Sequence, residues 1–179
     1  AMKISPAGFF NPGDVDKAIE DAVCVTRVTH DNQLAISGAC ATAAAISRAF
    51  DEKASVYDII QAGIYGARKG EEIGMRISRT VGGPKEDRLR KIYNLVGTGL
   101  HVSEAVPAAF GIILICDGDN WESVCEAVNV GYDTDTVAAI VGSIVGALKG
   151  TAGISEELFE ILNRENEIAL EETAEKVTA

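Results

Sequence analysis

Two segments of small and apolar residues constrain the fold of this chain more than any other feature. Leu34–Phe50 is rich in alanine, glycine and isoleucine and is apolar on nearly every face of a helix, and Val137–Leu148 has the same character. A helix that is apolar all round is buried in the core of a protein. The longest apolar run, Val137–Leu148, is well short of the roughly 18–20 residues that span a bilayer. We therefore predict two buried, central helices and no membrane span.

The composition agrees with a globular protein made of closely packed helices. Of its 179 residues, 47% are hydrophobic, 24% are charged and only 6% are aromatic, and 18 are glycine. The net charge of −11 has the wrong sign for nucleic-acid binding, which needs Lys and Arg to displace counterions from phosphates. We find no signal peptide at the start and expect a soluble, cytoplasmic protein.

Four cysteines are spread along the chain without a metal-binding pattern. None of them forms a Cys-x-x-Cys pair, and each lies among apolar neighbours. We expect buried free thiols rather than a zinc site. The four residues are Cys24, Cys40, Cys116 and Cys125.

Helical spacing recurs along the whole chain, and no alternating strand pattern is longer than a few residues. Asn11 and Pro12 are predicted to end an extended opening and to begin a helix capped by Asn11. Ser103 and Glu104 are predicted to cap another helix, with Pro107 near its first turn. We predict one all-α domain over residues 1–179, with helices over Val15–Thr26, Leu34–Phe50, Val56 to about Gly70, Pro84–Val96 (Leu89, Ile92, Tyr93 and Val96 inward), Ser103–Cys116, Trp121–Val130, Thr134–Gly150 and beyond Ile154.

The segment from Gly131 to Thr136 carries the strongest chemical signal. Asp133, Asp135 and Thr136 fall where one predicted helix ends and the next begins, so their oxygens can converge on one point. Two carboxylates and a hydroxyl form the hard oxygen cluster that Mg²⁺ or Mn²⁺ accepts. Capping of the following helix is the alternative, because Asp and Thr favour helix starts without any metal.

The apolar helix behind this segment favours a metal. If Val137–Leu148 lies in the core, the two carboxylates stand at a buried helix tip, where they repel each other and lose hydration. A divalent cation is the simplest compensation.

Three stretches resemble the C-terminal half of ADP-ribosylglycohydrolases, a family that includes the dinitrogenase-reductase-activating glycohydrolases and a lens crystallin (crystallin J1-like). The specific one is Ala127–Gly142 with its Asp133-Thr134-Asp135-Thr136 core, preceded by Val96–Gly99 and Glu104–Ala109. Thr29-His30 and Ala1–Lys3 with Pro6 and Gly8 resemble two further family segments. The resemblance extends to about Gly150.

The resemblance implies an all-α orthogonal helical bundle of this family's type, apparently without its N-terminal part. It implies two adjacent Mg²⁺ or Mn²⁺ ions held in part by Asp133, Asp135 and Thr136. His30 would lie near bound ADP-ribose, and the ligand would also meet Gly97, Thr98 and Gly99. A helix-capping or hydrogen-bonded surface position is the alternative for His30. The general base and the remaining metal ligands are expected from the N-terminal half, and no matching segment occurs in this chain.

Two positions depart from the family pattern. Tyr132 replaces the second glycine that usually precedes the Asp-Thr-Asp-Thr segment. Leu100 stands near the place where an aromatic residue would stack on the ligand, which predicts weaker binding of an aromatic base.

Two functions follow from these observations. The first is a metal-dependent hydrolase that cleaves the glycosidic bond between ADP-ribose and a modified side chain or small molecule. The second is a non-catalytic structural or ADP-ribose-binding remnant, or one half of a split enzyme. Ala1-Met2 fits either a start codon after a tag residue or a chain that begins inside a longer protein. We expect a homo-oligomer or a complementary N-terminal half as partner, since a large bare apolar face seldom occurs.

Overall fold

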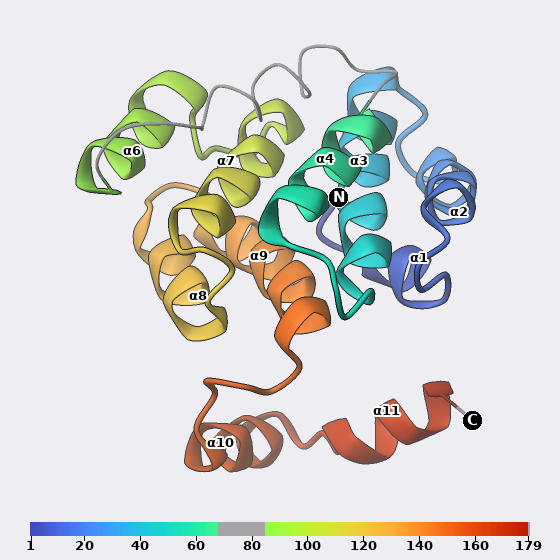
Figure 1. Ribbon diagram of the computed structural model, residues 1–179, viewed down its shortest axis with the longest axis vertical. Helices are drawn as coiled ribbons and strands as arrows, with labels where there is room; N and C mark the ends of the chain where they lie inside the picture. The colour runs from blue at the N-terminus through green and yellow to red at the C-terminus, as the bar shows by residue number, and fades with distance from the viewer. Residues whose placement is uncertain (68–84, 179) are drawn as a thin grey trace.

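The computed structural model describes residues 1–67 and 85–178. Every regular element in these ranges is a helix, so the predicted all-α class is confirmed (Figure 1). The elements are α1 (Ser5–Phe9), α2 (Val15–Arg27), α3 (Gln33–Ala49), α4 (Val56–Gly66), α6 (Lys85–Lys91), the π-helical η2 (Ile92–Val96), α7 (Val102–Ile115), α8 (Asn120–Asn129), α9 (Thr134–Lys149), α10 (Glu156–Asn166) and α11 (Leu170–Thr178).

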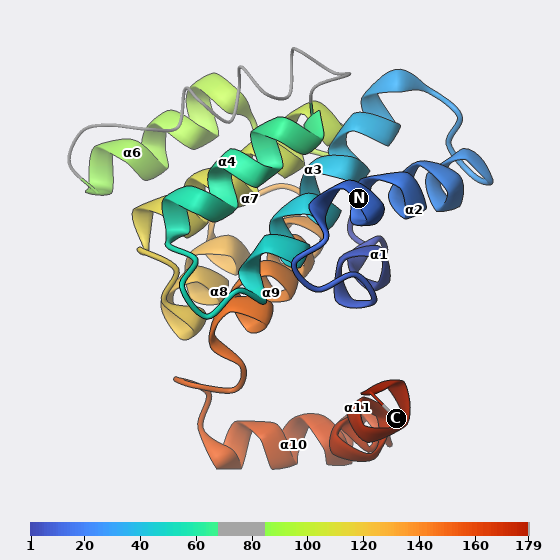
Figure 2. The same ribbon diagram turned by 45° about the vertical axis from the view of Figure 1, so that its right-hand side comes forward.

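Helix α3 is the buried central helix that the sequence predicts. It packs against α1, α2, α4, α7 and α9, which surround it in Figures 1 and 2. Nearly every side chain from Ser37 to Ala49 is buried. Small residues permit close contact between the helices, because a Cβ added at Gly66 of α4 would overlap the carbonyl oxygen of Cys40 in α3.

Helix α9 is buried along one face only, which corrects the prediction that it is enclosed. Its inner face consists of Val137, Ile140, Val141, Ile144 and Val145. On its other side, a Cβ added at Gly146 would meet nothing within 4 Å, and one at Gly142 would meet only Val124 at 3.8 Å. Alanine and glycine tolerate both core and surface, so a run of them does not reveal which face is open.

The first residues are helical rather than extended. Pro6 lies in the first turn of α1, where its fixed φ suits a helix. Asn11 does not cap α2; its amide donates instead to the Ala7 carbonyl and to Asp21. Asp14 takes the capping position, with Oδ1 3.0 Å from the Lys17 amide nitrogen. The predicted cap was therefore three residues too early.

The segment before α7 also differs from its prediction. The residues after Lys91 form a π-helix, which rotates the following side chains away from the expected stripe. Ile92 and Val96 are buried as predicted, but Tyr93 is 43% exposed. Ser103 and Glu104 do not cap α7, because His101 is at the N-cap position without a side-chain cap bond. Pro107 lies inside α7, beyond its first turn. The predicted boundaries at Gly70 and Pro84 lie outside the described residues.

Among the cysteines, Cys40 and Cys116 are buried free thiols as expected, whereas Cys24 is exposed and Cys125 is intermediate. Helices α10 and α11 extend away from the bundle in both views, and no residue of α10 is fully buried. Within the described ranges, no helix is both long enough and apolar enough to cross a membrane.

Candidate metal and ligand site

Two residues in the left-handed region form the turn between α8 and α9. Gly131 has φ +95° and Tyr132 has φ +59°. Glycine adopts such values freely, but for tyrosine the conformation costs about 1–2 kcal/mol. The turn brings Asp133 to the N-cap position of α9, with Asp135 and Thr136 in the first turn.

Capping does not explain Asp133. The N-cap side chains of α2, α3, α4, α8 and α10 each accept a hydrogen bond from a backbone amide of their own helix, whereas the side chain of Asp133 accepts none. Neither Asp133 nor Asp135 forms an ion pair with any described residue, and their carboxylate oxygens accept no hydrogen bond there. Two uncommitted carboxylates at one helix start are a donor set that suits a hard divalent cation.

The burial argument for a metal is wrong in one respect. Asp133 and Thr136 are partly buried, but Asp135 is exposed, so the residues that the structure describes do not enclose the tip of α9. Within the described residues, no group of three or more His, Cys, Asp and Glu side chains is arranged to hold a metal. The fit to a metal therefore rests on the free carboxylates and on the hydroxyl of Thr136.

The glycine-rich loop Gly97–Gly99 lies directly against this segment. The backbone amide of Asp133 donates to the carbonyl oxygen of Thr98 at 3.1 Å. Thr98 is fully buried, and its hydroxyl has no hydrogen-bond partner among the described residues. Two of the sequence-predicted segments, far apart in the chain, are thus joined by a backbone hydrogen bond.

Glu104 fixes the shape of that loop. Its Oε2 accepts a hydrogen bond from the Gly99 amide at 3.0 Å. A Cβ added at Gly97 or at Gly99 would lie only 2.7 Å from the same oxygen. The sequence predicted Glu104 as a helix cap, so this role was missed. The signal available in the sequence was the pair Gly97 and Gly99, a few residues before Glu104.

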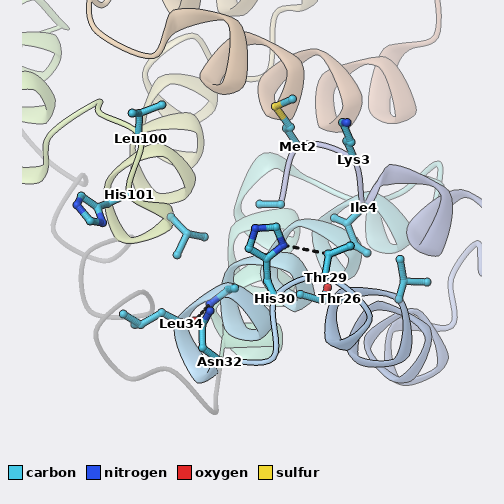
Figure 3. Close-up of a pocket in the computed structure, with 14 residues that line it drawn as sticks. Met2, Lys3, Ile4, Thr26, Thr29, His30, Asn32, Leu34, Leu100 and His101 are labelled. Atoms are coloured by element: carbon cyan, nitrogen blue, oxygen red, sulfur yellow. Dashed lines mark hydrogen bonds between the residues drawn. The ribbon is translucent and has the colours of Figure 1, made fainter.

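A cavity of about 530 Å³ lies beside the loop. Its walls come from the N-terminal segment, the turn after α2 and the start of α7, and Figure 3 shows His30 directed into the space between Met2 and His101. The Nδ1 of His30 lies 2.9 Å from the Thr29 hydroxyl oxygen. His30 and Leu100 therefore share one cavity, as a common ligand site requires.

Met2 connects this cavity with the acidic segment. It lines the cavity, and its sulfur accepts a hydrogen bond from the Thr136 hydroxyl at 3.3 Å. These contacts connect the cavity at His30, through Met2, with Thr136 at the start of α9, and Asp133 connects the same helix start with the Gly97–Gly99 loop.

A pair of stacked tyrosines stands at the edge of this region. The rings of Tyr93 and Tyr132 are 5.5 Å apart between centroids and 22° from parallel. A hydrogen bond with the Tyr132 phenol, and then its charge, raises the pKa of Tyr93 above its ordinary value. No local pattern in the sequence relates residues 39 positions apart, so this pair was not predicted.

The comparison with known families shows to which family the chain is related. A family model described as ADP-ribosylglycohydrolase matches residues 1–179. The chain belongs to the ADP-ribosylglycohydrolase family. The family assignment made from the Asp133–Thr136 segment is therefore confirmed, and so is the fold class that it implied.

Two relatives of this ADP-ribosylglycohydrolase chain are each 31% identical to it. One is the uncharacterized protein YegU of Escherichia coli strain K12, aligned over 94% of this chain and 54% of its own length. The other is an uncharacterized protein of Archaeoglobus fulgidus, aligned over 99% of this chain and 56% of its own length. The chain spans about half the length of the curated relatives it matches.

Proposed function

We propose that this chain provides the metal-binding wall of a hydrolase that cleaves the glycosidic bond between ADP-ribose and a modified side chain or small molecule. The observation that carries the proposal is the state of Asp133. Its backbone is fixed by Thr98, while its carboxylate is left out of the capping role that similar residues perform elsewhere in the chain.

In this proposal, Asp133, Asp135 and Thr136 hold Mg²⁺ or Mn²⁺. When bound, the metal would act as a Lewis acid and lower the pKa of a water molecule. The chain's own residues do the positioning: Thr98 and Glu104 fix the loop that anchors Asp133, and α9 presents the three oxygen groups from one turn.

We place the ribose that carries the bond to be cleaved against Asp133, with His30 beside the bound ADP-ribose. A two-metal site needs ligands on both sides, and two carboxylates supply only one side. The remaining ligands and the general base therefore come from another polypeptide segment, in a separate chain or in a longer parent protein. That segment also covers the exposed apolar residues around the cavity, Val25 and Leu100 among them.

One observation favours a second function, binding of ADP-ribose without hydrolysis. Asp135 is exposed and the described residues offer no third acidic ligand nearby, so the chain alone presents a half-site. A half-site can bind an ion and a ligand and still lack the group that deprotonates water.

Calorimetric titration with Mn²⁺ and Mg²⁺, with and without ADP-ribose, tests the proposal. The Asp133→Asn/Asp135→Asn double variant is expected to lose metal binding by at least about tenfold, the order of one lost charged ligand interaction. Asp119→Asn is the matched control, because Asp119 caps α8 in the ordinary way and asparagine caps equally well.

The outcomes separate the two functions. Metal binding that requires Asp133 and Asp135, together with release of ADP-ribose from a modified protein once the complementary N-terminal segment is supplied, supports the hydrolase. Metal-dependent ADP-ribose binding without turnover in the presence of that segment supports the binding function. Equal metal affinity in the wild type, the double variant and Asp119→Asn would reject the site itself.

A further inference from the structure

The stacked tyrosines at the rim of the site are unusually open for aromatic residues. Tyr132 is 76% exposed and Tyr93 is 43% exposed. One face of the Tyr132 ring lies against Tyr93, so the pair already forms a two-ring stack. Aromatic rings in water bury apolar area when a third ring stacks on the free face, and this gain is largely independent of the ring's substituents.

The backbone at Tyr132 holds the ring in place at a cost. Its φ of +59° is one that glycine or asparagine adopts more readily. Stability alone therefore favours a smaller residue here, and an observed backbone outlier at a candidate site is a reason to look for function.

Neighbouring residues leave room for the Tyr93 and Tyr132 rings to stack. Gly131 lies beneath Tyr93, and a Cβ at that position would come within 3.2 Å of the Tyr93 ring. Tyr93 itself belongs to the π-helical η2, a type of segment found frequently at functional sites. The stack thus depends on three local features: a glycine, a π-helix and a left-handed residue.

The position of the tyrosine pair next to Asp133 indicates which class of ligand it can bind. Tyr132 precedes Asp133 directly, so the stack adjoins the carboxylates that we assign to a divalent ion. A ligand that uses both features carries a planar ring at one end and sugar or phosphate oxygens at the other, which describes a nucleotide. Leu100, 86% exposed beside the cavity, offers no ring for that purpose.

We propose that Tyr132, supported by Tyr93, is the stacking surface for the nucleobase of a nucleotide ligand. The proposal rests on the proposed function for the neighbouring metal site, but it makes a separate claim: base recognition resides in this pair and not in the Leu100 segment.

The test compares AMP with ribose 5-phosphate, which has the same sugar phosphate without the base, in titrations of the full chain in Mg²⁺. Wild type is expected to bind AMP about tenfold more tightly than ribose 5-phosphate, within the range for one stacked base. Tyr132→Gly is expected to lose this preference and to keep its affinity for ribose 5-phosphate. Tyr132→Phe keeps the ring and is expected to keep the preference.

Folding does not confound this variant, because glycine relieves the backbone strain at position 132. The melting temperature of Tyr132→Gly is expected to equal or exceed that of the wild type. Tyr57→Leu is the matched control: Tyr57 is 64% exposed on α4, and its loss is expected to leave both affinities unchanged.

A second readout reports stacking directly. The base protons of AMP are expected to shift upfield in NMR spectra with the wild type and Tyr132→Phe, and not with Tyr132→Gly. Equal affinities of the wild type for the two probes, an absence of AMP binding, or an unchanged preference in Tyr132→Gly would each overturn the proposal. None of these results affects the metal titration of the Asp133 and Asp135 variants, so the two proposals fail separately.

Discussion

Gly63 of α4 lies against the ring of Phe110 in α7. A Cβ added there would overlap the ring of Phe110, which is fully buried. We expect Gly63→Ala to destabilise the protein by about 1–3 kcal/mol, the usual cost of overpacking a core, as measured by urea unfolding.

Gly146→Ala is the control for this prediction. Gly146 also lies within a helix, α9, but a Cβ there would meet nothing within 4 Å. Alanine is the better helix former by about 1 kcal/mol, so this variant is expected to be neutral or stabilising. Destabilisation of similar size in both variants would contradict the contact with Phe110 as the cause.

Single residues show where sequence reasoning stops. Asp14 and Asp133 both precede a helix, and aspartate is a residue type that favours the N-cap position. Only Asp14 caps, because the Asp133 backbone is tied to Thr98, a residue 35 positions earlier. The contact of the Asp133 segment with the Gly97–Gly99 loop depends on tertiary packing, which the residue types do not reveal. The metal-binding roles of Asp133, Asp135 and Thr136 and the ligand-binding role of His30 stay predictions.

At the scale of the element, α4 begins with a reciprocal hydrogen-bonded cap. Asp58 Oδ2 accepts from the Ser55 hydroxyl at 2.6 Å and from the Ser55 amide at 2.8 Å. The Ser55 hydroxyl bond, followed by the amide bond, lowers the pKa of Asp58 below its ordinary value of 3.8. A lowered folded-state pKa stabilises the protein above pH 3.8, and this contribution disappears as the pH falls through the folded pKa.

Ser55→Ala removes the first of these hydrogen bonds. At neutral pH we expect it to reduce the free energy of unfolding by about 1 kcal/mol, the usual effect of losing a serine cap. The difference from wild type is expected to shrink as the pH falls below 3.8, because protonated Asp58 no longer depends on Ser55. Urea unfolding from pH 7 to pH 3 measures this, and a difference that grows on acidification would contradict the assignment.

Most elements were predictable because each has a local cause. Ser55 and Asn32 cap their helices, and glycine or proline separates neighbouring segments. The failures arise where the cause is not local. The π-helical turn at η2 rotates Tyr93 outward, and the burial of α9 on one face follows from what packs beside it.

At the scale of the whole molecule, the chain divides into a packed bundle and a peripheral pair of helices. The bundle is built around α3, while α10 and α11 lie apart from it in both views (Figures 1 and 2). The pair is acidic and exposes Leu158, Ile161 and Leu162. The predicted self-association stays a prediction, and these apolar side chains are among the surfaces on which it depends.

This division predicts how far the C-terminus can be shortened. A chain that stops after Ile154 loses α10 and α11 but keeps the connection of the bundle to residues 150–152. There Asn120, which is buried, donates from Nδ2 to the carbonyl oxygens of Gly150 at 2.9 Å and Ala152 at 3.2 Å. We expect the melting temperature of this shortened chain, followed by circular dichroism, to stay within a few degrees of the full chain, because no residue of α10 is fully buried.

A chain that stops after Lys149 is the matched comparison. It removes only five further residues, but it leaves the Asn120 amide buried without acceptors, which costs about 1–3 kcal/mol. Its melting temperature is therefore expected to fall clearly below that of the chain ending at Ile154. If instead the loss of α10 and α11 alone lowers the melting temperature as much, the two helices contribute to the stability of the bundle and the division into two parts is wrong.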